Sequence, residues 1–296
     1  MNWTYQDAPH VPAIKTMQFH NGQPLPYLSF PLLEEQTWVQ HLFSTRMGGV
    51  SSGIFSSMNL GLNRGDDPDC VRENFRRIAE VFHTDPGHFV LSDQTHTSHV
   101  RLVTQADAGN GITREKTFFD TDGLITNEPG LVLATFYADC VPLYFADPVH
   151  HAIGLSHSGW RGTVQEMGRV TAEAMTQAYG TRPEDLICAI GPSICADCYE
   201  VDEPVAEEFR CLFRRLSRTE EKAERALRRK ENGHYQLDLW LANQWILEGA
   251  GVLSEHITTT GLCTCCNNKL LFSHRATGGK RGNLGAFLMI RPSGES

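Results

Sequence analysis

The sequence lacks the segments that would direct a chain into or across a membrane. No apolar run in its 296 residues approaches the roughly 20 residues that span a bilayer. The first 26 residues, MNWTYQDAPHVPAIKTMQFHNGQPLP, have neither the basic region nor the apolar core of a secretory signal. The sequence therefore predicts a cytoplasmic protein with no membrane partner.

The chain also lacks an excess of positive charge. It carries 26 Lys and Arg against 35 Asp and Glu, for a formal net charge of -9. Such a balance disfavours a phosphate backbone as the main partner, so we expect no nucleic-acid binding. Two charged helical patterns between residues 203 and 231 are best explained as solvated helix faces.

No Pro/Ser/Gly-rich linker and no internal repeat divides the chain, whose 41% hydrophobic content is ordinary for a globular protein. Residues 1–26 are polar and contain four prolines, which is typical of a loosely held tail or an edge ribbon. We therefore expect an N-terminal tail over 1–26 and a single domain over 27–296.

The nine cysteines are an odd number in a chain long enough to fold without disulfides, which favours a reducing compartment. Two groups occur, Cys195-x-x-Cys198 and Cys263-x-Cys265-Cys266. Because the second group does not look like a matching CxxC pair, the sequence does not favour structural zinc. A redox role is no better supported, since Cys195 follows a Gly-Pro loop.

The stretch from 131 to 163 combines long apolar runs with residues that carry chemistry. It predicts one long apolar strand, a turn at Asp147-Pro148, a second apolar strand and a Gly-Trp-Arg-Gly corner that opens a helix. Continuous apolar runs indicate strands that are covered on both faces. Within this stretch lie Asp139, Cys140 and His157, and side chains of these three types bind metals or transfer protons in many proteins.

His157 shares its strand parity with Ile153 and Leu155, so it is expected to lie among apolar neighbours. A histidine there needs a partner, and Cys140 on the adjoining strand is within reach. The simpler interpretation is a buried thiol beside a hydrogen-bonded histidine, with no function. The neighbouring Asp139 and the Arg-Gly corner favour a functional pair.

A third ligand is available upstream, at His96. Two histidines and a cysteine suit Zn²⁺ or a copper ion and leave one position open for water, as in catalytic metal sites. Spacing alone does not establish this triad, because His96, Cys140 and His157 are expected on three separate strands. His99 should point away from His96 if that segment is extended.

Several sequence blocks together resemble the laccase-domain family, first called multicopper polyphenol oxidase-like and later described as purine nucleoside phosphorylases. The matching blocks run from about Trp38 to Ile290 and are FSTRMGGVSSG, MNLG, QTH, DGLIT, ADCVPL, HSGWRGTV, AIGPSI with CYEVD, CTCC and FSHR. The resemblance implies an α+β fold of the CNF/laccase-domain type, a layered sandwich of mixed central β-sheets flanked by helices.

The resemblance also implies an activity and a metal. The family phosphorolyses adenosine, inosine and methylthioadenosine to the free base and sugar 1-phosphate, and it deaminates adenosine. It implies Zn²⁺, or copper, held by His96, Cys140 and His157. The partners are then purine nucleosides and phosphate, and we expect a monomer or small homo-oligomer.

Further residues receive expected roles from this chemistry. Asp139 would move protons during deamination. The phosphate would be held by amides of the helix after Gly162 and by three arginines, namely Arg46, Arg161 and Arg275. Substrate contacts or support for the ligands are expected from Asn59, Gln94 and His274.

Three other functions remain open at this point. A cysteine hydrolase would use Cys140 as nucleophile, His157 as base and Asp139 to orient the histidine. A copper-dependent polyphenol oxidase normally needs paired H-x-H motifs, and none occurs in the sequence. A binding or scaffold protein would not need polar residues at so many strand ends.

Overall fold

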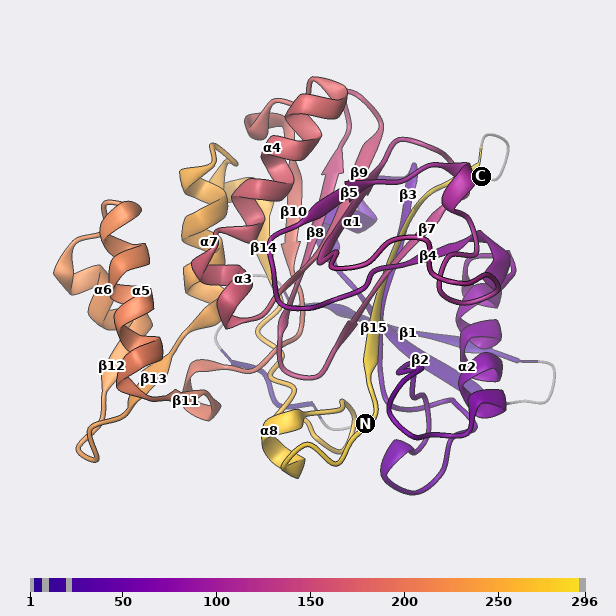
Figure 1. The fold of residues 1–296 in the computed structure, drawn as a ribbon, viewed down its shortest axis with the longest axis horizontal. Coiled ribbons are helices and arrows are strands. Elements are labelled where there is room, and N and C mark those ends of the chain that lie inside the picture. The colour runs from indigo at the N-terminus through magenta and orange to yellow at the C-terminus, as the bar shows by residue number, and fades with distance from the viewer. Residues whose placement is uncertain (1–2, 7–10, 20–22, 293–296) are drawn as a thin grey trace.

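The computed structural model describes residues 3–6, 11–19 and 23–292. Two six-stranded sheets pack face to face, and helices cover their outer faces (Figure 1). Helix α2 (Pro68–Val81) lies on one side, whereas α4 (Met167–Tyr179) and α7 (Leu239–Gly249) lie on the other. The expected α+β sandwich of mixed sheets flanked by helices is confirmed.

The first sheet is built around its C-terminal strand, which pairs antiparallel with β3 and β7. In spatial order its strands are β1 (Ala13–Gln18), β2 (Pro24–Ser29), β3 (Val39–Ser44), β15 (Leu284–Ile290), β7 (Val132–Tyr137) and β4 (Phe89–Leu91). Within the described part of residues 1–26, β1 and the start of β2 form an edge ribbon, which is one of the two expected arrangements.

The second sheet holds the two strands that flank the candidate site, β8 and β9. In spatial order its strands are β14 (Ile257–Thr259), β10 (Ile187–Ile190), β8 (Val141–Asp147), β9 (Ala152–Ser158), β6 (Gly123–Thr126) and β5 (Val100–Leu102). A small third sheet consists of β11 (Glu200–Val201), β13 (Tyr235–Leu237) and β12 (Leu227–Arg229).

The remaining α-helices are α1 (Pro31–Glu34), α3 (Trp160–Val164), α5 (Glu203–Arg215), α6 (Glu220–Ala226) and α8 (His274–Thr277). No helix within the described residues is both long and apolar enough to span a bilayer. Helix α2 starts at Pro68 because the Asp67 side chain accepts a hydrogen bond from the Asp69 amide and the proline occupies the first turn. Its apolar face, including Phe75 and Ile78, packs on the first sheet.

The prediction of one long strand across residues 131–147 is wrong, because this segment forms two strands that belong to different sheets. Strand β7 belongs to the first sheet and β8 to the second, and the chain crosses between the layers at Ala138, Asp139 and Cys140. Asp139 has a φ of 93°, which ends the extended run. One long buried strand and two consecutive buried strands have the same continuous apolar sequence, so the sequence alone could not distinguish these two structures.

Two helix predictions also need correction. The helix after the Gly-Trp-Arg-Gly corner is split into α3 and α4 by Glu166, whose φ is 58°. The second charged pattern ends at Ala226, and Leu227–Arg229 continues as strand β12.

We expect acidification to destabilise the fold through His41 of β3. This ring is 5% exposed, and its Nε2 accepts a hydrogen bond from the Phe30 amide at 2.8 Å. Burial lowers the pKa of His41 from 6.5 to about 4. The unfolded chain therefore binds the extra proton first, so this stabilisation is complete above pH 6.5 and is lost as the pH falls toward 4.

Between pH 7 and a pH below 4, the free energy of unfolding should fall by about 3 kcal/mol through this group. Denaturant unfolding between pH 7 and 4.5 measures it, and His41→Gln should flatten the dependence, whereas the exposed His88→Gln should not. Equal slopes for wild type and His41→Gln would contradict the assignment.

Candidate functional site

The three side chains predicted as metal ligands converge at one point of the structure. His96, Cys140 and His157 each offer a ligand atom, and these atoms lie within 4.8 Å of one another. The Cys140 Sγ lies 4.0 Å from the His96 Nε2. His157 is buried, Cys140 is half-buried and His96 is exposed, so the group opens toward solvent on one side.

Each ligand candidate is placed by a different local feature. His157 lies near the end of β9, opposite Pro142 of β8. Cys140 lies at the crossing between the sheets, directly before β8. His96 lies in the loop between β4 and β5, with a φ of 66°, and not in a strand as predicted. His99 pairs instead with Asp120, at 2.9 Å.

A residue that the sequence did not single out, Asp122, supports two of the three side chains. One of its carboxylate oxygens lies 2.7 Å from His157 Nδ1, and this carboxylate also accepts hydrogen bonds from the Thr95, His96 and Thr97 amides at 3.0 to 3.2 Å. The contact orients the His157 ring and leaves Nε2 as the nitrogen that would bind a metal. The available signal was an acidic residue directly before the buried strand GLIT.

The Asp122 carboxylate is ionised despite being fully buried. Burial raises its pKa, but the hydrogen bonds and the charge of His157, together with the Thr95 and Thr97 amides, lower it to about 2. The site therefore contains a fixed negative charge behind His157.

Cys140 and His157 shift each other's proton affinity. Burial opposes ionisation of the thiol, yet His157 and His96 lower the pKa of Cys140 to about 6. Burial likewise disfavours the charged imidazole, but Cys140 and Asp122 raise the pKa of His157 to about 9. The thiol is thus poised to act as a thiolate, the form that binds metals or attacks electrophiles.

A cavity of about 320 Å³ opens over the triad. Its walls include Phe136 and Tyr137 and the cationic side chains of Arg64, Lys116 and Arg281. Lys116 is paired with Asp93. Burial, followed by the charge of Arg64, lowers the pKa of Arg281 to about 10, and its buried Nε has no partner among the described residues. Sequence reasoning missed both Arg64 and Arg281.

The three arginines predicted to hold phosphate do not line this cavity. Arg46 donates hydrogen bonds to the Ser56 and Asn268 carbonyl oxygens, each at 2.9 Å, and stacks over Phe272. The Arg161 guanidinium lies over the Trp160 ring at 4.2 Å and has no hydrogen-bond or ion-pair partner within the described part of the chain.

Arg275 and Asp139 are joined to each other. The Arg275 amide donates to one Asp139 oxygen, and the Thr264 hydroxyl donates to the other, both at 2.6 Å. The Arg275 guanidinium donates to the carbonyl oxygens of Cys198 and Glu200, at 3.4 and 3.0 Å. Asp139 therefore anchors the segment that begins α8.

The other predicted substrate contacts lie at different places. Gln94 is on the cavity wall, where its amide group bonds the Phe136 backbone in both directions at 2.7 Å. Asn59 is buried and accepts hydrogen bonds from the Gly61 and Asn283 amides, so it holds the cavity wall together. His274 is exposed at the start of α8.

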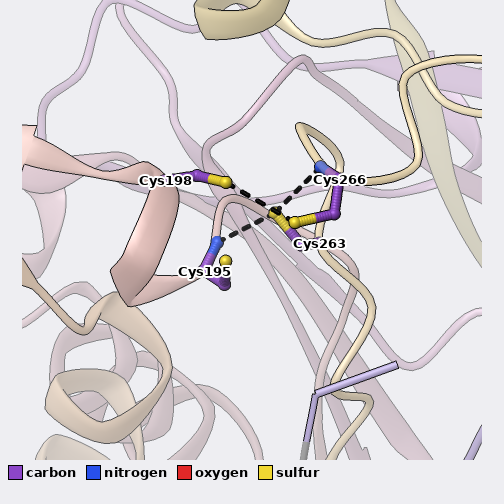
Figure 2. Close-up of side chains that lie close together, drawn as sticks. All are labelled: Cys195, Cys198, Cys263 and Cys266. Atoms are coloured by element: carbon purple, nitrogen blue, oxygen red, sulfur yellow. Dashed lines mark hydrogen bonds between the residues drawn. The ribbon is translucent and has the colours of Figure 1, made fainter. Parts of the chain in front are cut away.

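A second group of potential ligands lies apart from the triad, although the spacing of its cysteines did not lead us to expect a metal site. Figure 2 shows Cys195, Cys198, Cys263 and Cys266 close together. Their sulfur atoms lie within 4.8 Å of one another. Cys263 and Cys266 do form a CxxC pair, which the adjacent Cys265 obscured. This largely buried cluster can bind a metal ion.

Residues 40–291 match the family described as multi-copper polyphenol oxidoreductase laccase, and the chain belongs to this family. Its fold is that of YlmD from Geobacillus stearothermophilus, with a TM-score of 0.83, 35% identity and coverage of 95% of this chain and 100% of that one.

Named relatives in the family are enzymes. Purine nucleoside phosphorylase YlmD of Bacillus subtilis is 41% identical over 250 residues, covering 84% of this chain and 87% of the relative. Adenosine deaminase RL5, from an unknown prokaryotic organism, is 31% identical over 238 residues, covering 80% of this chain and 88% of the relative.

We expect Gly159→Ala to disturb the triad while leaving the backbone unstrained. The φ of Gly159 is -70°, which alanine accepts, but an added Cβ would lie 3.0 Å from His96 Cδ2 and 3.1 Å from Cys140 Sγ. Overpacking of this kind costs about 1–3 kcal/mol, and here it would displace the His96 and Cys140 side chains. Zinc affinity should therefore drop in a competition titration. Gly162→Ala, whose Cβ meets atoms no closer than 3.4 Å, is the control, and an equal effect of both would contradict this account.

Asp122→Asn should weaken metal binding more than it weakens the fold. Loss of the charge behind a ligand histidine typically costs about 10- to 100-fold in metal affinity or activity. Asp147→Asn provides a matched control, because Asp147 is also fully buried and pairs with His150 at 2.8 Å, at the end of β8 opposite to Cys140. Metal affinity that is equal in the two variants would show that Asp122 does not support the ligands.

Proposed function

We propose that this chain is a metal-dependent purine nucleoside phosphorylase that also deaminates adenosine, with residues 27–296 acting as a single catalytic domain. The observation that carries the proposal is the convergence of His96, Cys140 and His157 beneath a cavity with cationic walls. The named activities of the relatives agree with it.

The donor set fits a zinc ion. Two imidazole nitrogens and a thiolate are ligands that Zn²⁺ prefers, and copper is the second candidate. The hydrogen bond from His157 to Asp122 leaves Nε2 as the ligand atom, and the lowered pKa of Cys140 favours the thiolate. When bound, the ion supplies Lewis acidity that favours attack of water on the purine ring during deamination.

The cavity offers a site for phosphate beside the triad. In phosphorolysis a phosphate oxygen forms a bond to the sugar C1′ while the bond to the purine nitrogen breaks, so the anion must be held close to the sugar. Arg64 and Arg281 lie on the cavity wall and suit this role. Two candidates lie outside it, namely Arg275 and Arg161, whose guanidinium has no ion-pair partner among the residues that the structure describes. The contacts of Arg46 favour a supporting role.

The remaining residues position substrate or carry protons. Asp139 accepts one hydrogen bond at each carboxylate oxygen and retains lone pairs, so it stays our candidate for proton transfer. Gln94 lies where it can contact the substrate directly. Asn59 acts through the cavity wall, and His274 is available from the exposed start of α8.

A cysteine hydrolase is the second candidate, and one observation favours it. The Cys140 thiol with its lowered pKa, His157 and the Asp122 carboxylate form the order nucleophile, base and orienting acid. In this hydrolase Asp122 would orient His157, which is the role that the sequence suggested for Asp139. A stoichiometric ion bound by the Cys140 thiolate is incompatible with this function, whereas alkylation of Cys140 in active, metal-free protein would favour it.

The proposal predicts distinct products with and without phosphate. Metal-replete protein should convert adenosine to adenine and ribose 1-phosphate only when phosphate is present, and to inosine in either case. His96→Ala, Cys140→Ala and His157→Ala should each abolish both reactions, because each removes a ligand. Chromatography of the products measures this.

His99→Ala is the matched control, since His99 is a nearby exposed histidine that pairs with Asp120. It should retain turnover. Activity that survives removal of Cys140 or His157 would overturn the proposed function.

A further inference from the structure

The four-cysteine cluster has the dimensions of a tetrahedral metal site. The Cys198 and Cys266 sulfurs are 3.5 Å apart, and all four lie within 4.8 Å of one another. Four thiolates at about 2.3 Å from a zinc ion would be spaced about 3.8 Å apart. A disulfide would need about 2.05 Å, so the sulfurs are arranged around a common centre and not as bonded pairs.

Backbone amides in the cluster already face a sulfur atom. The amides of Cys195 and Cys266 both donate to Cys263 Sγ, at 3.3 and 3.4 Å (Figure 2). Donors directed at a buried sulfur stabilise a thiolate, the form that binds metals. The two CxxC pairs also come from separate loops, as in closed structural sites.

We propose that Cys195, Cys198, Cys263 and Cys266 bind a structural Zn²⁺ ion, distinct from the ion proposed for the His96, Cys140 and His157 triad. Four thiolates complete the tetrahedral coordination of Zn²⁺, so no open position remains for a substrate. The role of this ion is to hold two chain segments together.

The segments in question are residues 191–199, after β10, and residues 260–268, after β14. They pair beside the cluster through a bridge between Ser193 and Cys263, in which the Thr264 amide donates to the Ser193 carbonyl oxygen at 3.1 Å. The two CxxC pairs are 68 residues apart in the chain. An ion between them therefore closes a long loop.

Both segments also contact Asp139, which precedes Cys140. The Ile194 amide donates to the Asp139 carbonyl oxygen at 3.0 Å, and the Thr264 hydroxyl donates to its carboxylate at 2.6 Å. The Cys198 carbonyl oxygen accepts from the Arg275 guanidinium. Arg275 is therefore bonded directly to a cluster residue and is positioned by the cluster, a consequence for catalysis that rests on the proposed function.

Metal analysis of the full chain tests the site itself. Zinc-edge X-ray absorption of wild-type protein, isolated without added metal and without oxygen, should show an all-sulfur component at about 2.3 Å. Cys266→Ser should lose one zinc equivalent per chain. Cys266→His should keep the ion with one nitrogen ligand in place of sulfur, because position 266 is exposed and can accommodate the ring.

Cys211→Ser serves as the control, since Cys211 lies on α5 outside the cluster and should lose no zinc. The proposal is overturned if wild-type protein has no all-sulfur zinc component, if iron fills the site, or if the cluster contains a disulfide. If Cys266→Ser does not fold, the wild-type spectrum and the Cys266→His variant still show whether the four cysteines bind zinc.

The positioning role has a separate readout. Cys266→Ser should raise the KM for phosphate more than it lowers kcat for deamination, because Arg275 loses its anchor whereas the triad is untouched. An equal fall in both reactions would indicate a general structural effect and would overturn the positioning role. A protein with the zinc signature but no phosphorolysis would refute the proposed function and leave the structural site intact.

Discussion

The buried Asp122 carboxylate is the interaction on which the candidate site depends. A charge without partners at such a position would cost several kcal/mol, so its hydrogen bonds are needed for the fold as well as for the site. The partners are the His157 ring and the amides of the loop that carries His96. One ionised group therefore orients two ligands that come from distant parts of the chain.

The layer crossing at Ala138–Cys140 supplies the third ligand. Because β7 and β8 belong to different sheets, the chain must leave one layer and enter the other, and Cys140 is placed where the layers meet. The carboxylate of Asp139 then connects this crossing to Thr264, after β14, and to Arg275 in the first turn of α8. Ile194 and Thr264, which are next to Cys195 and Cys263, both donate hydrogen bonds to Asp139 of this crossing, and these bonds link the two metal sites proposed for this chain.

The sequence predicts the local parts of this arrangement better than the long-range ones. The strand that carries His157 and helix α2, with its Asp67 cap and Pro68, follow from periodicity and capping, which are local properties. The split at Asp139 is not visible, because both halves of the run are buried and apolar. Asp122 was overlooked because its partners are 25 to 35 residues away, and no local pattern shows a hydrogen bond of that range.

In the candidate site, too, the sequence predicts residues that lie in recognisable motifs and not those that depend on long-range contacts. The motifs pointed to His96, Cys140 and His157, but Arg64 and Arg281 reach the cavity only through the folding of two separate loops. The second CxxC pair was present in the sequence and was obscured by the extra Cys265. Contacts of Arg46 with the backbone, in turn, could not be foreseen from a Gly/Ser-rich loop that is equally typical of an anion site.

The most direct test of the central claim is a crystal structure of the metal-replete protein with anomalous diffraction recorded on both sides of the zinc absorption edge. The account predicts an anomalous peak bonded to the His96 and His157 Nε2 atoms and to Cys140 Sγ, with the Asp122 carboxylate still hydrogen-bonded to His157 Nδ1. A well-ordered site with no peak at the triad, or with these side chains turned away from one another, would contradict it.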